Sequence, residues 1–155
     1  MTLLSATLPM LAAEVRQLLM NLTPRLRASH KFTTSKALED GTDWEEVEHV
    51  PRLFTIEWDS AAEPYTMGSA TYSLKLTALI SIWYPLRGWS MERLVDAEHI
   101  RDAMKGIAGA GGGASTVAAV SYRLIDPAGG ASVEETEDGI WLVLPLVADV
   151  AATQA

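Results

Sequence analysis

Asp96, Glu98 and His99 bring two carboxylates and an imidazole into one short segment, a combination that can ligate a metal ion. On a helix, the three-residue step from Asp96 to His99 places both side chains on one face. The other histidines, His30 and His49, fall in a distant irregular segment. Because so few ligands gather in one place, we expect a solvated helix face here and no metal centre.

Other patterns that invite a catalytic interpretation lack the required spacing. The Gly-rich segment 109–115 has no Lys followed by Ser or Thr, as a phosphate-binding loop requires, and it follows a predicted helix. No Gly-x-Ser-x-Gly motif marks a hydrolase nucleophile. Glu45 and Glu46, like Glu134 and Glu135, are sequence neighbours whose side chains diverge on a helix or strand. We therefore expect no catalytic residues and no cofactor, with 109–115 as a flexible connector.

The composition restricts the classes of protein and partner. The 155 residues suffice for a single domain, 1–155, with a substantial core. The net charge of −8 opposes tight binding to a phosphate backbone, but it suits a channel through which DNA slides. The absence of Cys excludes disulfides and thiolate metal sites. Residues 1–22 lack the basic start of a signal peptide, and no apolar run reaches the roughly 20 residues of a membrane helix.

Among the elements that would position a site, the strand predicted at 72–84 is the most informative. Apolar residues occupy every second position, which indicates one apolar face and one mixed face. At about 3.3 Å per residue the strand would extend roughly 40 Å, about twice the usual length. A small domain does not need so long a strand for its own core. We expect it to project, or to be covered by a neighbouring subunit, as in an assembly protein.

Two segments carry the three- and four-residue apolar spacing of amphipathic helices. The first covers 8–22 and has Thr7 as its predicted N-cap. The second covers 91–107, and its predicted apolar side includes Met91 and Leu94. We expect both apolar sides to pack on the core.

Alternation predicts three more strands, at 52–59, 117–126 and 140–150. Pro145 lies inside the last of them and cannot donate to a ladder, which favours an edge strand or a bulge. The order of elements predicts an α+β fold, with a largely antiparallel or mixed sheet of about four main strands and two helices packed on one face. The tail 151–155 is expected to fray.

The segment 25–50 shows no clear periodicity and is long for a connection in a compact domain. We interpret it as an irregular insertion that is either functional or mobile. Trp44 lies among its acidic residues. That side chain either anchors an interface or folds back onto the core, and the sequence favours neither.

The second face of the predicted sheet is too apolar to be simply solvated, because it carries Trp83, Trp141, Val143 and Val147. We hypothesise that a partner covers it, with Trp44, Trp83, Trp141 and Val143 at the interface. Ordinary core burial of the tryptophans is the alternative. The acidic residues hypothesised to face a lumen or a partner are Asp43, Glu45, Glu46, Glu134 and Glu135.

In the order and pattern of its elements, the chain resembles the tail terminator family of long-tailed bacteriophages and the related tail-completion and neck proteins. The likeness rests on the apolar helix at 8–22, the strand Arg52-Leu53-Phe54-Thr55-Ile56-Glu57-Trp58, the long strand closing in Trp83-Tyr84-Pro85, the helix at 91–107 and the two final strands. It covers most of the chain, and the segment 25–50 has no counterpart in the shared pattern.

The resemblance implies a structural virion protein with no catalytic residues and no cofactor. Such a protein would form a homo-oligomer, a hexameric ring on the head-proximal end of the tail tube, where it stops tube polymerisation and joins the tail to the head connector. Its partners would be the tail tube protein and the head–tail connector protein, and DNA would pass through its lumen without tight binding. It would belong to the tail or neck of the virion. It would assemble in the host cytoplasm and would not bind a membrane.

Three alternatives stay open at the level of sequence. Another neck component, such as a head-closure protein or a connector adaptor, shares the broad architecture. A small α+β enzyme or ligand-binding domain would instead show a deep polar pocket with a titrating His99 or His49. A bacterial scaffold protein unrelated to phage is the third alternative.

Overall fold

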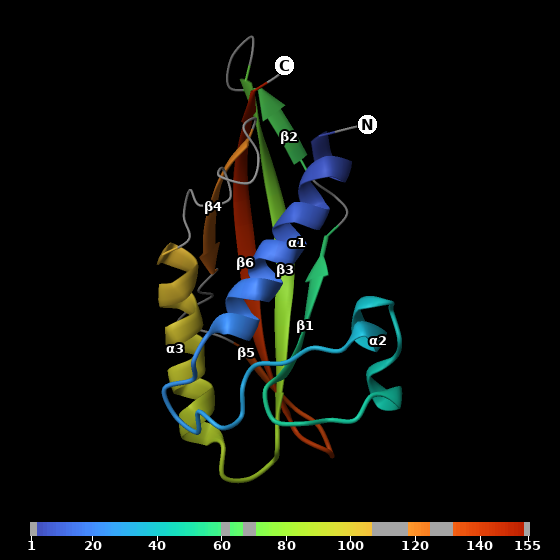
Figure 1. Cartoon of the computed structure of the whole chain (residues 1–155), viewed down its shortest axis with the longest axis vertical. Helices are drawn as coiled ribbons and strands as arrows, with labels where there is room; N and C mark the ends of the chain where they lie inside the picture. The colour runs from blue at the N-terminus through green and yellow to red at the C-terminus, as the bar shows by residue number, and fades with distance from the viewer. Residues whose placement is uncertain (1–2, 60–62, 67–70, 107–117, 125–131, 154–155) are drawn as a thin grey trace.

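A computed structural model describes residues 3–59, 63–66, 71–106, 118–124 and 132–153 (Figure 1). The fold is α+β, as predicted. The predicted elements correspond to α1 (Leu3–Asn21), β1 (Leu53–Trp58), β3 (Thr71–Tyr84), α3 (Ser90–Gly106), β4 (Ala118–Leu124) and β6 (Ile140–Thr153). Among the described helices, none is long and apolar enough to cross a membrane. The Gly-rich segment 109–115 lies outside the described residues.

Two long antiparallel strands, β3 and β6, form the centre of the sheet. They pair over their full lengths, from Thr71 opposite Thr153 to Tyr84 opposite Ile140. Each also pairs on its outer side with two short strands. On β3 these are β1 and β2 (Glu63–Thr66), and on β6 they are β4 and β5 (Ser132–Glu135). All these pairs are antiparallel. The long strand predicted at 72–84 is confirmed as β3, and the strands that pair with it, β1, β2 and β6, belong to the same chain.

The prediction that the last strand lies at an edge is wrong, because β6 is central. Its outer side is covered in two stretches: β5 pairs with 140–143 and β4 with 146–152. Pro145 falls in the gap between them while it pairs across with Leu79 of β3. A residue without an N–H is best tolerated at such an interruption of the ladder. β6 also continues to Thr153, well into the tail that was expected to fray; residues 154–155 lie outside the described part.

The helices α1 and α3 cover one face of the sheet (Figure 1), as predicted. Leu11, Val15 and Leu19 of α1 recur every four residues and are fully buried. They pack with the alternate residues of β3 and β6 that point to the same face, among them Ile80, Ile82, Leu144 and Leu146. Removing these apolar side chains from water is the main stabilising contribution to the fold, about 1.5–3 kcal/mol for each large side chain.

The two helices differ from prediction in their details. α1 begins at Leu3, so Thr7 lies inside it and is not the N-cap. On α3 the predicted apolar side is wrong near the start of the helix, because Met91 is 60% exposed and Leu94 is 70% exposed, whereas Ile100 and Met104 of the same predicted side are fully buried. The buried row of α3 contains Glu92, Asp96, Ile100 and Met104. Two carboxylates therefore occupy core-facing positions, which no count of apolar residues can reveal.

The segment 25–50 passes the lower end of α3 in this view and then crosses to the outer side of β1, where it forms α2 (Lys36–Glu39) (Figure 1). It also contains a 3₁₀ turn, Trp44–Glu46. Ser35 caps α2 by accepting a hydrogen bond from the Leu38 amide at 3.3 Å. Leu38 packs with Leu53 and Trp83. The segment thus reaches the sheet face that α1 and α3 leave free.

Candidate functional site

A buried ion pair joins the start of β1 to α3. The Nε of Arg52 donates to Oδ2 of Asp96 at 2.7 Å, and its Nη2 donates to Oδ1 at 3.1 Å. Both side chains are fully buried. The Tyr84 hydroxyl also donates to Oδ2 of Asp96, at 2.7 Å. The expectation of a solvated helix face is therefore wrong for Asp96, whose charge is compensated in the core by a residue 44 positions away in the sequence.

The remaining donors of Arg52 hold the chain between α1 and β1. Its Nη1 donates to the carbonyls of Arg27 at 2.7 Å and His30 at 3.0 Å, and its Nη2 donates to that of Leu26 at 2.7 Å. These bonds complete the five N–H donors of the guanidinium. Arg52 also has a left-handed φ of 66°. That conformation costs a residue with a Cβ about 1–2 kcal/mol, which the hydrogen bonds offset.

The cluster of Arg52, Asp96 and Tyr84 has a structural role. Burial first, and then the charge of Asp96, raise the pKa of Tyr84 well above its ordinary value of 10.0. A reacting group must meet its substrate, and none of these residues lines either of the two hollows described below. We therefore place no chemistry at this cluster.

The other residues of the metal hypothesis lie apart. Glu98 is exposed and His99 is half-buried on α3. His30 packs edge-on against Trp89, with 5.2 Å between the ring centroids. His49 lies on the opposite face of the sheet, against Trp83. Within the described ranges, no three His, Asp or Glu side chains are grouped so that they could hold a metal ion.

The sheet face opposite α1 and α3 is built from cross-strand rows. Residues paired in register across β1, β3 and β6 share a face. The three rows are Leu53–Trp83–Trp141, Thr55–Ser81–Val143 and Glu57–Leu79–Pro145. Glu134 of β5 pairs with Trp141 and so extends the first row. This face changes along its length from an aromatic, partly covered end to an open end where Leu79 is 44% exposed.

The aromatic end of this face forms a hollow of about 380 Å³, which we call the aromatic–acidic pocket. Its volume lies within the usual range for ligand sites, near the lower limit. The rows of the sheet supply part of its lining, and the 3₁₀ turn, the segment between that turn and β1, and the β5–β6 turn supply the rest. Its rings are Trp44, His49, Trp83 and Trp141; its carboxylates are Glu45, Glu134 and Asp138; Ser81, Thr136 and Val143 complete the lining.

The rings of the pocket pack on one another. Trp44 meets Trp141 edge-to-face, with centroids 4.3 Å apart and planes at 71°. His49 stacks on Trp83, with centroids 5.1 Å apart and planes at 20°. Both arrangements are favourable for aromatic pairs. Trp83 is buried, whereas Trp44, Trp141 and His49 are only half-buried. The pocket therefore has a packed aromatic base with ring surface left accessible to a ligand.

The pocket brings together all four residues hypothesised for an interface: Trp44, Trp83, Trp141 and Val143. For Trp83, which is 8% exposed, the chain itself supplies much of the cover, through Leu38, Trp44 and Val47. Of the acidic set, Glu45 and Glu134 line the pocket. Asp43, Glu46 and Glu135 are exposed and do not line it. A partner or lumen for these residues stays a prediction.

Two residues important to the pocket were not predicted from the sequence as site residues. Asp138 lines it, and Gly139 permits its construction. A Cβ placed at Gly139 would lie 2.3 Å from Nε1 of Trp83 and 2.6 Å from the carbonyl oxygen of Tyr84. Only glycine allows the β5–β6 turn to pass so close to the indole. The sequence signal for it is a glycine directly before the strand predicted at 140–150, a position that by itself indicates only a strand boundary.

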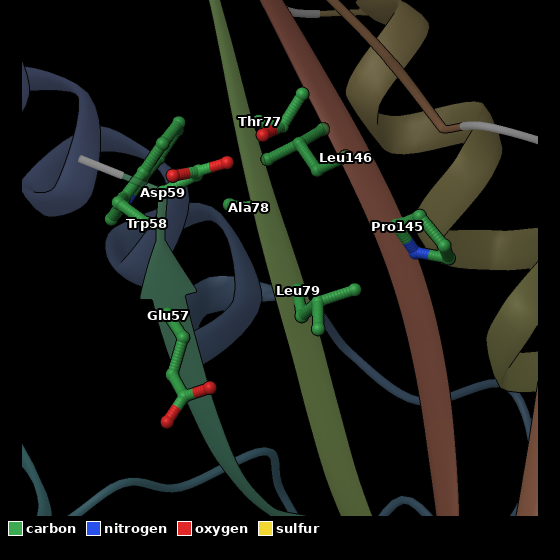
Figure 2. Close-up of a pocket in the computed structure, with 8 residues that line it drawn as sticks. All are labelled: Glu57, Trp58, Asp59, Thr77, Ala78, Leu79, Pro145 and Leu146. Carbon is green, nitrogen blue, oxygen red and sulfur yellow. The ribbon is translucent and has the colours of Figure 1, made fainter. Parts of the chain in front are cut away.

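A second hollow, of about 430 Å³, lies at the open end of the same face. Figure 2 shows Glu57 on β1, Leu79 on β3 and Pro145 on β6 around it, with Asp59 just beyond the end of β1. The Asp59 amide donates to the Thr77 carbonyl at 2.9 Å, which keeps this end of the chain against β3. The lining is largely apolar with carboxylates at its margin, so it suits a protein surface better than a polar small molecule.

The chain matches no model of a protein family, no curated protein and no solved structure.

Proposed function

We propose that this chain is a structural virion protein, a tail terminator that forms a ring on the head-proximal end of the tail tube. In this role it stops tube polymerisation and joins the tail to the head connector. It acts in the tail or neck of the virion after assembly in the host cytoplasm. The observation that carries the proposal is the open sheet face around Leu79, where a central strand of the sheet leaves a large apolar side chain 44% exposed.

An exposed leucine on a central strand, beside a largely apolar hollow, favours contact between proteins over an enzyme surface. Leu79 lies in the row between Glu57 and Pro145, and its neighbouring hollow is largely apolar. A single exposed leucine is common on a monomer, but one on a central strand beside an apolar hollow offers a surface that a neighbouring subunit can cover. Ring closure needs a heterologous contact, in which this face meets a different surface of the next subunit. The α+β fold with two 14-residue central strands is consistent with the terminator pattern.

The charge of the chain supports the same role. The net charge of −8 and the exposed carboxylates of Asp43, Glu46 and Glu135 suit a ring that surrounds DNA without holding it. The alternative within this class is another neck component, a head-closure protein or connector adaptor. Binding of the purified protein to tail tubes supports the terminator, and binding to the portal or connector instead supports the other neck component.

The proposal is tested by light scattering after size exclusion, on purified protein with and without tail tubes. We expect a discrete species near six times the subunit mass of 16.8 kDa, or capped tube ends in electron micrographs. Leu79→Glu should abolish the ring. Leu94→Glu makes the same change at a 70% exposed leucine on α3 and should preserve it. Loss of the ring in both variants, or in neither, contradicts the assignment of the open face. A protein that neither forms a ring nor binds tube ends refutes the terminator role.

A further inference from the structure

We propose that the aromatic–acidic pocket binds an arginine side chain presented by a basic segment of a different protein. The pocket adjoins the open face at Leu79 on the same side of the sheet, but the two hollows share no lining residue. The inference does not require the ring, because every residue that lines the pocket comes from one chain.

The rings of the pocket suit a planar cation. Trp44, Trp141 and His49 are half-buried, so parts of their surfaces remain free in the hollow. A tryptophan face attracts a cation through its quadrupole, and a guanidinium can in addition stack flat on the ring. The chain already uses this contact elsewhere, since the guanidinium of Arg27 lies 4.4 Å from the ring centroid of Trp89. An ammonium group lacks the flat surface, so arginine fits better than lysine.

Carboxylates surround the rings, in positions where they can pair with the positive charge of a bound guanidinium. Glu45 enters from the 3₁₀ turn, Glu134 from β5 and Asp138 from the β5–β6 turn, and all three are exposed. Among the residues that the structure describes, no arginine or lysine lines the pocket to neutralise them. A carboxylate accepts hydrogen bonds from a guanidinium in a fixed bidentate geometry. Rings at the base and acids at the margin thus select a side chain with an apolar stem and a planar charged end.

The charge of the protein indicates that the arginine comes from elsewhere. At a net charge of −8, long-range electrostatics favours a basic protein over a second copy of this acidic chain as the occupant of an acidic pocket. Four of its own arginines are engaged in ion pairs, namely Arg16 with Glu39, Arg25 with Asp102, Arg27 with Glu92 and Arg52 with Asp96. A basic segment of another protein is attracted by the same charge, which also accelerates its approach.

The test is a titration of the isotopically labelled full chain with three capped tripeptides that differ only in the central residue: acetyl-Gly-Arg-Gly-amide, its citrulline analogue and its lysine analogue. Binding is followed by NMR through the indole N–H signals of the five tryptophans. We expect the arginine peptide to shift the signals of Trp44 and Trp141, with a Kd on the order of 1 mM for so small a ligand. The lysine peptide should bind more weakly, and the neutral citrulline peptide at least about tenfold more weakly.

Two matched variants separate the pocket from the general charge. The rim variant Glu45→Gln, Glu134→Gln, Asp138→Asn removes three exposed carboxylates that line the pocket. The control Glu48→Gln, Glu98→Gln, Asp40→Asn removes three exposed carboxylates that line neither the pocket nor the open face. Because every site is exposed, both variants should fold, and their circular dichroism checks this. We expect the rim variant to weaken arginine binding at least about tenfold and the control to change it less than about twofold.

The outcomes are decisive in either direction. Equal binding of the arginine and citrulline peptides, equal loss in the two variants, or no indole shift at about 20 mM peptide overturns the proposal. Self-association through the pocket, seen as a ring that the rim variant abolishes and the control preserves, also overturns it in favour of a second copy as occupant. The ring test at Leu79 and this titration use different residues and different measurements, so each proposal can fail alone.

Discussion

The guanidinium of Arg52 and the carboxylate of Asp96 form two hydrogen bonds, of 2.7 Å and 3.1 Å. Both side chains lie in the core and are fully excluded from solvent. This pair connects the beginning of β1 to the middle of α3. The same guanidinium holds the carbonyls of Leu26, Arg27 and His30. One side chain thus connects three segments of the chain, so loss of the pair should weaken the contacts of all three.

Asp96→Asn should destabilise the protein by about 3–5 kcal/mol, because it leaves the Arg52 charge buried without its counter-charge. Chemical denaturation measures the effect. Glu98→Gln makes the corresponding change at an exposed site on the same helix and should alter the free energy of unfolding by less than about 0.5 kcal/mol. A loss under about 1 kcal/mol for Asp96→Asn would show that the pair is not held as described.

Tyr84 makes stability depend on pH at alkaline values. Its pKa is raised in the folded state, chiefly by burial, so the folded protein holds this proton more tightly than the unfolded chain does. Its contribution is fully present below the ordinary pKa of 10.0 and is lost as pH rises from there toward the folded pKa. The free energy of unfolding should therefore fall with pH in that window. Tyr84→Phe, measured in parallel, should show a shallower fall; identical slopes would contradict this account.

Tyr84→Phe should also lower stability at neutral pH. The hydroxyl donates to the buried Asp96 carboxylate at 2.7 Å, and a hydrogen bond to a charged group contributes about 1.5–3 kcal/mol. Denaturant unfolding at neutral pH gives the value directly. An unchanged midpoint would mean that the hydroxyl of Tyr84 is not needed by Asp96.

Gly139→Ala should disrupt the aromatic–acidic pocket. The added Cβ meets the Trp83 indole and the backbone carbonyl of Tyr84, and relieving such overpacking costs about 1–3 kcal/mol. We expect a lower midpoint of unfolding and a displaced indole N–H signal for Trp83. Glu137→Ala, in the same turn at an exposed position, is the matched control and should leave both unchanged. A native-like indole spectrum in Gly139→Ala would refute the close approach.

The orientation of α3 is tested by two truncations. Ile100→Ala removes a fully buried side chain and should cost about 2–5 kcal/mol. Leu94→Ala removes a 70% exposed one and should cost less than about 0.5 kcal/mol. The sequence pattern had placed Leu94 on the apolar side, so a large loss at this position would restore the first interpretation of the helix and contradict the structure.

Local periodicity determined most of the elements. Alternation identified β1, β3, β4 and β6, because a strand with one buried face must place an apolar residue at every second position. Three- and four-residue spacing identified the two main helices, and their order indicated the α+β class. The short strands β2 and β5 were missed, since four residues carry too little pattern and β5 reads Ser-Val-Glu-Glu.

Tertiary structure alone decided the features that depend on partners distant in sequence. Pro145 is acceptable in a central strand because β5 and β4 leave a gap at this point of β6. Asp96 is buried because Arg52, 44 residues away, compensates its charge. The tryptophans of the pocket are neighbours because strand register and a turn through Gly139 place them together. Sequence records which residue types are present and their local period, whereas burial of a charge and assembly of a pocket depend on long-range contacts that only the folded chain makes.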